Sequence, residues 1–413
     1  MTLYYSPGWA NLFLLVTVII ASYILGIVAY RLYLSPLARI PGPKLAALTT
    51  WYNAYHDLWR GGQYVWVVEE MHRKYGPIVR VRPDVIHIND PAFIEKLYTQ
   101  SPKHRREKYW TTLQTLYSLR SILATQDHDL HRRRRAALNP FFSQQNVRRL
   151  DPIISDTFAN LLRRMGGWAV VGSPVRMSIP SRAAVKDVIQ ACAFGEGEKC
   201  LEMEDCSSGF FDLSSYTGAN SSSWNPLLLA QLGYGQCASN YHDNSGAPSC
   251  DLCKVCRGVG GPSRGGGSRR QDHTCPGEGL VYEALDGKFC VIPAGTAMGM
   301  WVPILNRTPD LYGQPNLFRP ERYLENPKLS KYLMSFSKGG RQCLGMGLAY
   351  QELYTFTAGL VRRYNIYDPS KKHQDGPTLE LYQTIREDIA MHADHIVMPP
   401  REGSPGLRVI TRS

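Results

Sequence analysis

Dense clusters of charge are scarce in this chain of 413 residues. It carries 35 acidic residues against 47 Lys and Arg, a formal charge of +12, but the basic residues are dispersed. Only residues 131–135, His-Arg-Arg-Arg-Arg, form a dense basic run. A nucleic-acid groove needs basic side chains gathered along one face, so nucleic acid is excluded as a partner. The excess charge favours an anionic membrane or an acidic protein instead.

Charge is missing altogether from residues 10–30, in which Leu, Val and Ile predominate. About 20 such residues in a helix cross the hydrocarbon core of a bilayer. No basic residue precedes the run, as a cleaved signal peptide requires, whereas Arg31, Arg39 and Lys44 follow it. These features predict a single transmembrane anchor, with residues 1–9 as a short lumenal N-terminus and the large domain in the cytosol.

The residues after the anchor predict a hinge and then helices with a small sheet. Residues 31–44 contain Ile-Pro-Gly-Pro, a stiff segment that cannot continue a helix. Helical spacing predicts a helix over residues 64–75. Alternating apolar and polar residues predict two strands joined by a turn over residues 78–88.

Two aspartates that each precede a proline predict the starts of further helices. Such an aspartate caps the first turn, and the proline occupies a position that needs no N–H donor. Asp90 predicts a helix over residues 92–98, and Asp151 predicts one over residues 153–165.

An apolar period is missing from residues 213–279, where Gly, Ser and Cys accumulate. This irregular segment separates residues 45–212 from residues 280–413, which we expect to form two parts of one domain. Order returns with a strand predicted over residues 289–292 and an apolar helix over residues 344–364.

Ten cysteines call for an explanation other than disulfides, because the orientation of the anchor places them in a reducing compartment. Cys250, Cys253, Cys256 and Cys275, with His273, superficially resemble a zinc or iron–sulfur site. The spacing to Cys275 fits no ferredoxin cluster. One hypothesis is therefore a membrane-tethered interaction protein that binds zinc.

Cys343 stands apart from the other cysteines, after a glycine-rich turn and before a predicted helix. Backbone N–H groups and the positive end of a helix favour the thiolate form of such a cysteine. Glycines let the backbone pass close to a flat ligand. A thiolate in this position can hold heme iron and favour cleavage of the O–O bond.

The residues around this cysteine match a signature, Phe-x-x-Gly-x-Arg-x-Cys-x-Gly, at Phe336, Gly339, Arg341, Cys343 and Gly345. The chain therefore resembles the cytochrome P450 family. The resemblance implies that Cys343 is the axial ligand of heme b (iron protoporphyrin IX), that Phe336 shields its sulfur and that Arg341 pairs with a heme propionate.

Further segments carry the same resemblance. Leu348, Ala349, Glu352 and Leu353 match the Leu-Ala-x-x-Glu-Leu pattern of the family's next helix, in which Ala349 is expected beside the cofactor.

The basic run matches the family's third helix, which implies that His131 and Arg135 contact heme propionates. Glu321 and Arg322 match a Pro-Glu-Arg-Phe segment, with Tyr323 in place of Phe, and are expected to be structural.

Two elements of the family pattern are missing. The sequence contains no Ala-Gly-x-Asp/Glu-Thr run, which supplies the acid and hydroxyl for proton delivery, and no Glu-x-x-Arg in the region that directly precedes Leu280. The second motif normally pairs with the arginine at position 322, and a buried arginine without a partner is unfavourable. Residues 213–279 stand in place of both elements. The expected fold is mainly α with small β-sheets, a P450 fold incomplete in the middle and preceded by one transmembrane helix.

The resemblance implies a monooxygenase that hydroxylates or epoxidises an apolar small molecule, using O2 and electrons from NADPH–cytochrome P450 reductase. The Pro-Gly-Pro hinge and Tyr75-Gly76-Pro77 are typical of microsomal, especially fungal, members that act in secondary metabolism. The implied location is the endoplasmic reticulum membrane, with the heme domain cytosolic. An inactive, heme-binding relative is the alternative within the same family.

Overall fold

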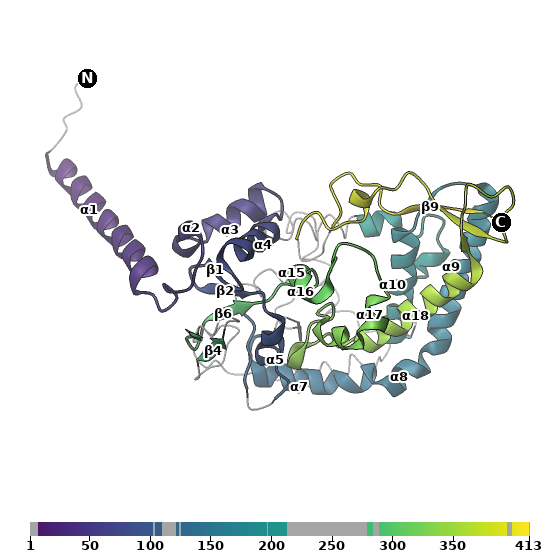
Figure 1. The fold of residues 1–413 in the computed structure, drawn as a ribbon, viewed down its shortest axis with the longest axis horizontal. Helices are drawn as coiled ribbons and strands as arrows, with labels where there is room; N and C mark the ends of the chain where they lie inside the picture. The colour runs from purple at the N-terminus through teal and green to yellow at the C-terminus, as the bar shows by residue number, and fades with distance from the viewer. Residues whose placement is uncertain are drawn as a thin grey trace, which may run out of the picture. The chain divides into compact units, whose positions relative to one another are not determined.

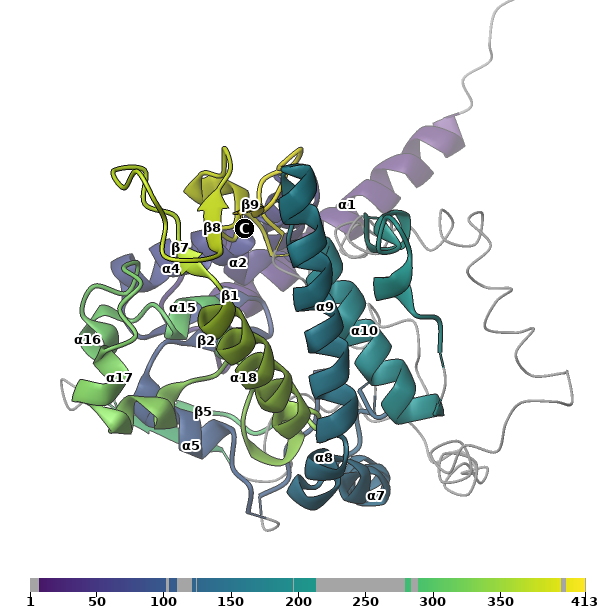
Figure 2. The same cartoon turned by 90° about the vertical axis from the view of Figure 1, so that its right-hand side faces the viewer.

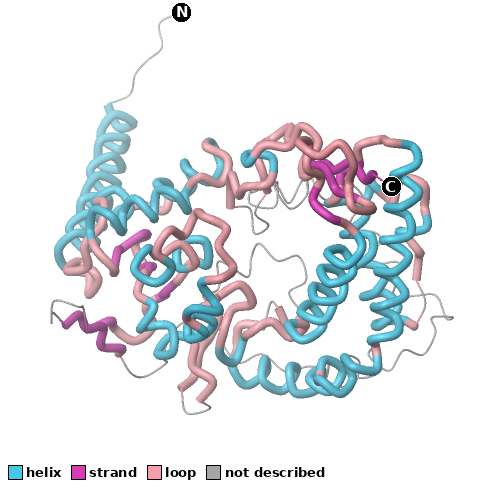
Figure 3. The backbone as a smooth tube through the Cα atoms, turned by 45° about the vertical axis from the view of Figure 1, so that its right-hand side comes forward, coloured by secondary structure: helices cyan, strands magenta, loops and turns pink. Residues whose placement is uncertain are grey.

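The computed structural model describes residues 7–101, 104–109, 121–123, 125–195, 197–212, 279–283, 289–394 and 399–412. Two compact units make up the chain: Met1–Gln114 with Arg269–Gly340, and Thr115–Ser268 with Arg341–Ser413. Helices predominate among the described residues and the strands form small sheets, which confirms the expected fold class (Figures 1 and 3). Of the segment predicted to be irregular, residues 213–278 lie outside the described residues, and so do the four cysteines of the zinc hypothesis.

The first unit begins with the apolar helix α1 (Pro7–Ala29), which continues as a turn of π-helix, η1 (Tyr30–Leu34). The stretch Trp9–Leu34 is long and apolar enough to cross a membrane, and its large side chains are exposed. This helix agrees with the predicted anchor at residues 10–30 and extends it at both ends.

The Pro-Gly-Pro segment after the anchor is packed against the first unit. Pro41 accepts a hydrogen bond from the backbone N–H of Arg80 at 2.8 Å. A Cβ atom at Gly42 would lie 2.5 Å from the carbonyl oxygen of Arg80, so only glycine allows this close approach. The sequence predicted a hinge here, and the structure shows it docked on a strand.

Short helices and a three-stranded sheet follow in the first unit. The helices are α2 (Lys44–Leu48), α3 (Trp51–Ala54), the π-helix η2 (Tyr55–Trp59), and α4 (Tyr64–Tyr75), which matches the predicted range. Strands β1 (Ile78–Arg82) and β2 (Val85–Ile88) pair antiparallel, as predicted, and β6 (Ala297–Gly299) adds to β2 in parallel. Residues more than two hundred positions apart thus share one sheet.

The remaining elements of the first unit are short. They are the 3-10 turn η3 (Pro91–Phe93), α5 (Ile94–Leu97), the hairpin of β4 (Leu280–Glu283) and β5 (Phe289–Ile292), then α15 (Val302–Leu305), α16 (Pro309–Tyr312), α17 (Arg322–Glu325), η6 (Pro327–Tyr332) and η7 (Gly339–Arg341), whose last residue belongs to the second unit. The Asp90 carboxylate caps the first turn as predicted, accepting from the N–H of Ala92 at 2.8 Å.

The second unit is built on long helices. They are α7 (His128–Leu138), the 3-10 turn η4 (Asn139–Phe142), α8 (Gln144–Arg149), α9 (Asp151–Val171), α10 (Ser178–Phe194), the 3-10 turn η5 (Cys200–Glu202) and α18 (Met346–Arg363). Figure 2 shows α10 and α18 flanking α9. A four-stranded sheet in the order β3 (Val175–Arg176), β9 (Arg408–Arg412), β8 (Thr378–Leu381) and β7 (Asn365–Ile366) completes the unit, with the 3-10 turn η8 (Arg386–Asp388) between β8 and β9.

Helix α9 departs from the prediction in its bounds and its cap. It ends at Val171, beyond the predicted residue 165, and Asp151 is its first residue instead of its cap. The Asp151 carboxylate accepts a hydrogen bond from the side chain of Gln351 in α18 at 2.6 Å. A tertiary contact has therefore replaced the local capping bond that the sequence predicted.

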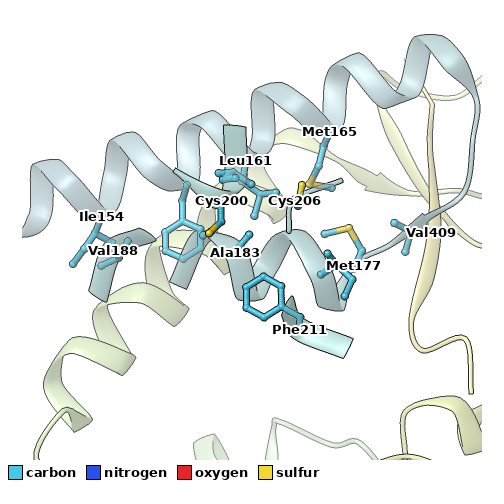
Figure 4. Packing of buried hydrophobic residues seen from close by; sticks show 14 of the residues in the cluster. Ile154, Leu161, Met165, Met177, Ala183, Val188, Cys200, Cys206, Phe211 and Val409 are labelled. Carbon is cyan, nitrogen blue, oxygen red and sulfur yellow. The ribbon is translucent and has the colours of Figure 1, made fainter. Parts of the chain in front are cut away.

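The core of the second unit lies between α9 and α10 (Figure 4). Ile154, Leu161 and Met165 of α9 meet Ala183 and Val188 of α10, and all five side chains are fully buried. The small alanine allows the helices to approach closely, so the larger side chains of α9 fill the space between them.

A buried pair of histidines connects α4 to the sheet of the first unit. His72 Nδ1 lies 2.8 Å from the carbonyl oxygen of Gly76, and its Nε2 lies 2.6 Å from His87 Nδ1. His87 Nε2 accepts from the N–H of Trp301 at 2.8 Å. Only one arrangement of protons satisfies this chain: both rings neutral, each with its proton on Nδ1.

Acid should destabilise the fold through this pair. Burial lowers the pKa of His72, and burial together with His72 lowers that of His87 further. Both groups therefore contribute stability that is complete above the unfolded pKa near 6.5 and is lost as the pH falls below it. We expect the melting temperature of wild type to drop between pH 7.5 and pH 5.5, and less so for His72→Gln/His87→Gln. His373→Gln, at an exposed site, is the control; an equal drop in all three proteins would contradict the assignment.

Candidate functional site

The loop that carries Cys343 precedes α18, whose first residue is Met346. The thiol is free and the residue is exposed. Helix α18 begins two residues later than predicted and ends at Arg363. Leu348 is buried in the core of the second unit, while Ala349 is half-buried one turn from the loop. The core contact of Leu348 therefore fixes the direction in which the loop leaves the helix.

Arg341 attaches this loop to the residues just before α7. Its Nη1 donates to the carbonyl oxygen of Thr125 at 2.7 Å and its Nη2 to that of Gln126 at 2.6 Å. The sequence singled out Arg341 but not its acceptors, because backbone carbonyls leave no mark in a sequence. This guanidinium therefore has a structural role in the loop whatever it binds besides.

Arg135 of α7 holds the same loop from another side. Its Nη1 donates to the carbonyl oxygen of Gln342 at 2.5 Å, beside Cys343. Burial lowers the pKa of Arg135, and the nearby Cys343 thiol counteracts part of that shift. His131 lies one helical turn earlier on α7 and is buried. The structure thus brings together Cys343, Arg135, Arg341 and the helix that carries His131, whereas their roles toward a heme stay predictions.

Phe336 and Gly339 belong to the first unit. Phe336 is half-buried, and the adjacent Ser337 adopts a positive φ of 56°. Gly339 has a φ of 72°, and a Cβ atom there would lie 2.5 Å from the carbonyl oxygen of Tyr98. Both conditions require glycine at position 339. Gly345, in the second unit, faces the ring of Phe142, to which an added Cβ would come within 3.8 Å.

Arg322 satisfies its guanidinium with backbone oxygens. It donates to the carbonyls of Arg319, Tyr312, Gln314 and Leu317, the last at 2.8 Å. In the part of the chain that the structure describes, it forms no ion pair. Glu321 is exposed and its carbonyl accepts the first N–H bonds of α17. This cage of carbonyls was not foreseen, and it stabilises the turn between α16 and α17 without a carboxylate.

Glu352 is a buried carboxyl group on the face of α18 that packs into the second unit. Only 7% of the residue is exposed, and Oε1 has no hydrogen-bond partner among the described residues. Burial raises its pKa to about 7. Its carboxyl also raises the pKa of Cys192 on α10, although burial of that thiol is the larger cause. The sequence identified Glu352 only as part of a motif, and its burial became evident in three dimensions.

Metal binding by other residues gains no support in the described regions. Across residues 7–101, 104–109, 121–123, 125–195, 197–212, 279–283, 289–394 and 399–412, no group of three or more His, Cys, Asp or Glu side chains is placed to hold a metal ion. Cys250, Cys253, Cys256, Cys275 and His273 lie outside these residues, so the zinc hypothesis stays a prediction.

Comparison with known proteins identifies the family. A family model described as Cytochrome P450 matches residues 45–232 and 284–388. The chain belongs to the cytochrome P450 family. The match extends past residue 212, so the P450 sequence continues further into the central segment than the composition predicted.

Three fungal relatives resemble this P450 over nearly its full length. Cytochrome P450 monooxygenase tpcC of Cochliobolus heterostrophus is 29% identical, covering 96% of each chain. Cytochrome P450 monooxygenase astB of Talaromyces wortmannii is 30% identical, covering 92% of this chain and 94% of the relative. Stellatic acid synthase of Emericella variicolor is 30% identical, with coverage of 94% and 93%. Such relatives establish that this P450 is an oxidoreductase of the monooxygenase type.

The alignments with these relatives are longer than the chain itself. The alignment with tpcC is 508 positions long, whereas this chain has 413 residues, so at least 95 aligned positions have no counterpart here. The family match is interrupted between residues 232 and 284. The expected incompleteness of the P450 fold in its middle is thus consistent with the relatives.

The P450 family implies a heme-thiolate cofactor, and the residues of the second unit fit one. Cys343 offers an exposed thiol at the end of a loop that two arginines hold in place. Gly345 leaves the backbone beside it free of a side chain. An exposed sulfur with cationic neighbours is the environment in which a thiolate ligand is stabilised.

Gly339→Ala should destabilise the loop, because the new Cβ would collide with the Tyr98 carbonyl and the backbone would be strained. Backbone strain alone costs about 2 kcal/mol. We expect a lower melting temperature and reduced heme content in the purified protein. Gly340→Ala is the matched control, since nothing lies within 4 Å of a Cβ there. Equal stability of the two variants would show that the loop relaxes freely.

Glu352→Gln should remove a pH dependence of stability. The folded pKa of about 7 exceeds the unfolded value of 4.5, so the contribution of Glu352 is greatest below pH 4.5 and is lost as the pH rises through 7. The difference amounts to about 3 kcal/mol. We therefore expect Glu352→Gln to equal wild type near pH 5 and to be more stable at pH 8 in chemical denaturation. Glu402→Gln, at an exposed position, should show no such pH-dependent difference from wild type. The same difference in Glu402→Gln would refute the assignment.

Proposed function

We propose that this P450 is a heme-thiolate monooxygenase of fungal secondary metabolism that hydroxylates or epoxidises an apolar small molecule. The supporting observation is the signature loop at Cys343, held by Arg135 and Arg341 in a chain whose fungal relatives are P450 monooxygenases. One of these relatives, stellatic acid synthase, is named after a single product, and that name applies to the relative only. The substrate of this chain is proposed by chemical class only.

In this proposal the Cys343 thiolate would hold the iron of heme b, and the heme would supply the activation of molecular oxygen when bound. Arg135 and Arg341 would pair with the heme propionates through charge-assisted hydrogen bonds. His131 adds a third polar contact from the same face of α7. Phe336 and Gly339 of the first unit, and Gly345 and Ala349 of the second, are proposed to contact the cofactor as the family signature implies.

Electrons are proposed to come from NADPH–cytochrome P450 reductase at the endoplasmic reticulum membrane. Helix α1 supplies the anchor, which places the folded units in the cytosol according to the basic residues that follow it. Arg132 and Arg133 are exposed on α7 and suit an acidic protein partner.

A second candidate function, an inactive heme-binding relative, is favoured by the missing middle. The chain lacks the acid and hydroxyl of the Ala-Gly-x-Asp/Glu-Thr run and at least 95 positions of the tpcC alignment. Without a positioned acid, the site would lack the proton delivery that productive oxygen activation requires. The two candidates differ in turnover and agree in heme binding.

The test is to reconstitute the full-length chain with a fungal reductase and to measure NADPH consumption coupled to product. Coupled turnover supports the monooxygenase, whereas a heme spectrum without turnover supports the inactive relative. Cys343→Ala should lose the red-shifted Soret band of the ferrous carbon monoxide complex, because that band requires a thiolate ligand. Arg132→Ala, at an exposed position, should keep it. A band that survives in Cys343→Ala would show that another residue holds the iron.

A further inference from the structure

A cavity of about 520 Å³ in the first unit lies between η2 and α4, away from the cysteine loop in sequence. Its lining includes Tyr52 of α3, His56 of η2 and Arg60, the residue that follows η2. Trp66 and Lys74 of α4 also line it. The spacing of four residues places the first three side chains on one face of the helical segment. The cavity therefore has aromatic walls and two cationic groups.

His56 is a polar group in the lining of this cavity. It is 8% exposed, and its Nδ1 has no hydrogen-bond partner among the described residues. Tyr64 stacks on the ring and Tyr52 contacts its edge, with a distance of 5.1 Å between the centroids of Tyr52 and His56. Burial, and then Arg60, lowers the pKa of His56, so the ring is neutral and can donate one hydrogen bond.

The charge around the cavity is positive. Glu70 is the acidic group of the lining, and Arg73 neutralises it with an ion pair of 2.6 Å. Arg60 and Lys74 form no ion pair within the described chain, and Lys74 lies 5.3 Å from the centroid of the Tyr75 ring. A cavity with two unpaired cations and a neutral donor selects an anion, and an arginine can hold a phosphate with two parallel bonds.

The position of the cavity in the first unit indicates which class of anion it would bind. Pro43, in the segment that follows the anchor, lines it. Arg31, at the end of the anchor, donates to the carbonyl of Leu48, and Arg80 donates to the carbonyl of Arg31 at 2.7 Å. The membrane end of the chain is therefore hydrogen-bonded to α2 and β1, in the same unit as the cavity.

The next face of the same helical segment carries exposed aromatic residues. Trp51, Tyr55 and Trp59, each one position before a lining residue, are 67%, 52% and 69% exposed. The ring centroids of Trp51 and Trp59 lie 6.4 Å apart, so they form one patch. Tryptophan and tyrosine gather at the level of lipid headgroups, because their rings are both apolar and polar.

From these observations we infer that the cavity binds the phosphate of an anionic phospholipid. Arg60, Lys74 and the ring of His56 contact the headgroup, and the patch of Trp51, Tyr55 and Trp59 lies in the membrane interface beside it. The first unit then has a lipid-specific contact in addition to its transmembrane helix. This inference depends on a membrane location but not on heme binding or turnover, so it can fail while the proposed function stands.

The experiment uses the full-length chain in a neutral detergent, titrated with short-chain phosphatidylglycerol, short-chain phosphatidylcholine or inorganic phosphate while tryptophan fluorescence is followed. Phosphatidylglycerol should bind more tightly than the other two. Arg60→Gln/Lys74→Gln should weaken its binding about thirtyfold, since each basic group near an anionic headgroup contributes a factor of about five. Lys328→Gln, at an exposed position outside the lining, should bind like wild type.

A second measurement remains informative even if the double variant folds poorly. Brominated phosphatidylcholine in nanodiscs should quench the fluorescence of wild type more than that of Trp51→Phe/Trp59→Phe. Equal affinity for phosphatidylcholine and phosphatidylglycerol, or an equal loss in Lys328→Gln, would overturn the headgroup site. If inorganic phosphate binds as tightly as the lipid, the cavity is a site for free phosphate. If the Trp51→Phe/Trp59→Phe variant is quenched as much as wild type, the aromatic patch does not lie in the membrane interface.

Discussion

The hydrogen bonds that hold the loop before α18 are the constraint on which the chemistry of this P450 depends. Arg341 reaches the carbonyls of Thr125 and Gln126, and Arg135 reaches the carbonyl of Gln342. The two guanidinium groups hold Cys343 between the start of α7 and the start of α18. A sulfur that must serve as an axial ligand needs a fixed backbone, because small displacements of a metal ligand weaken its bond.

Two polar groups, Arg322 and Glu352, differ in how well the fold satisfies their hydrogen bonds. Arg322 donates to four backbone carbonyls, so the turn between α16 and α17 does not require the acid of a Glu-x-x-Arg helix. Glu352 is less well satisfied, because its carboxyl is buried with one oxygen unbonded among the described residues. An arginine can replace a lost partner with local carbonyls, whereas a carboxyl group needs a donor brought to it.

The first unit combines a membrane anchor with polar interactions that its apolar residues do not reveal. The His72–His87 pair links α4, the sheet and Trp301 through one consistent set of protons. The neighbouring cavity at His56 has two cations that form no ion pair among the described residues. The two histidines and the cavity lining lie within residues 43–87, so one short stretch of the sequence both supports the sheet and forms the cavity.

Much of this protein was determined by the sequence alone. The uncharged run, the helix over residues 64–75, the strand pair before Asp90 and the family signature around Cys343 are local patterns, because they depend on neighbours within a few positions. The family comparison and the described elements confirm the anchor candidate, these elements and the family. The assignment of Cys343 as the iron ligand stays a prediction.

Only the tertiary structure decided which distant groups meet. Asp151 does not cap its helix but accepts a hydrogen bond from Gln351. Arg322 donates to backbone carbonyls instead of a carboxylate, and Glu352 is a buried acid. Backbone acceptors carry no residue identity, and burial depends on packing between helices far apart in the chain. For that physical reason, the partners of these side chains were not readable from the sequence, although the side chains themselves were.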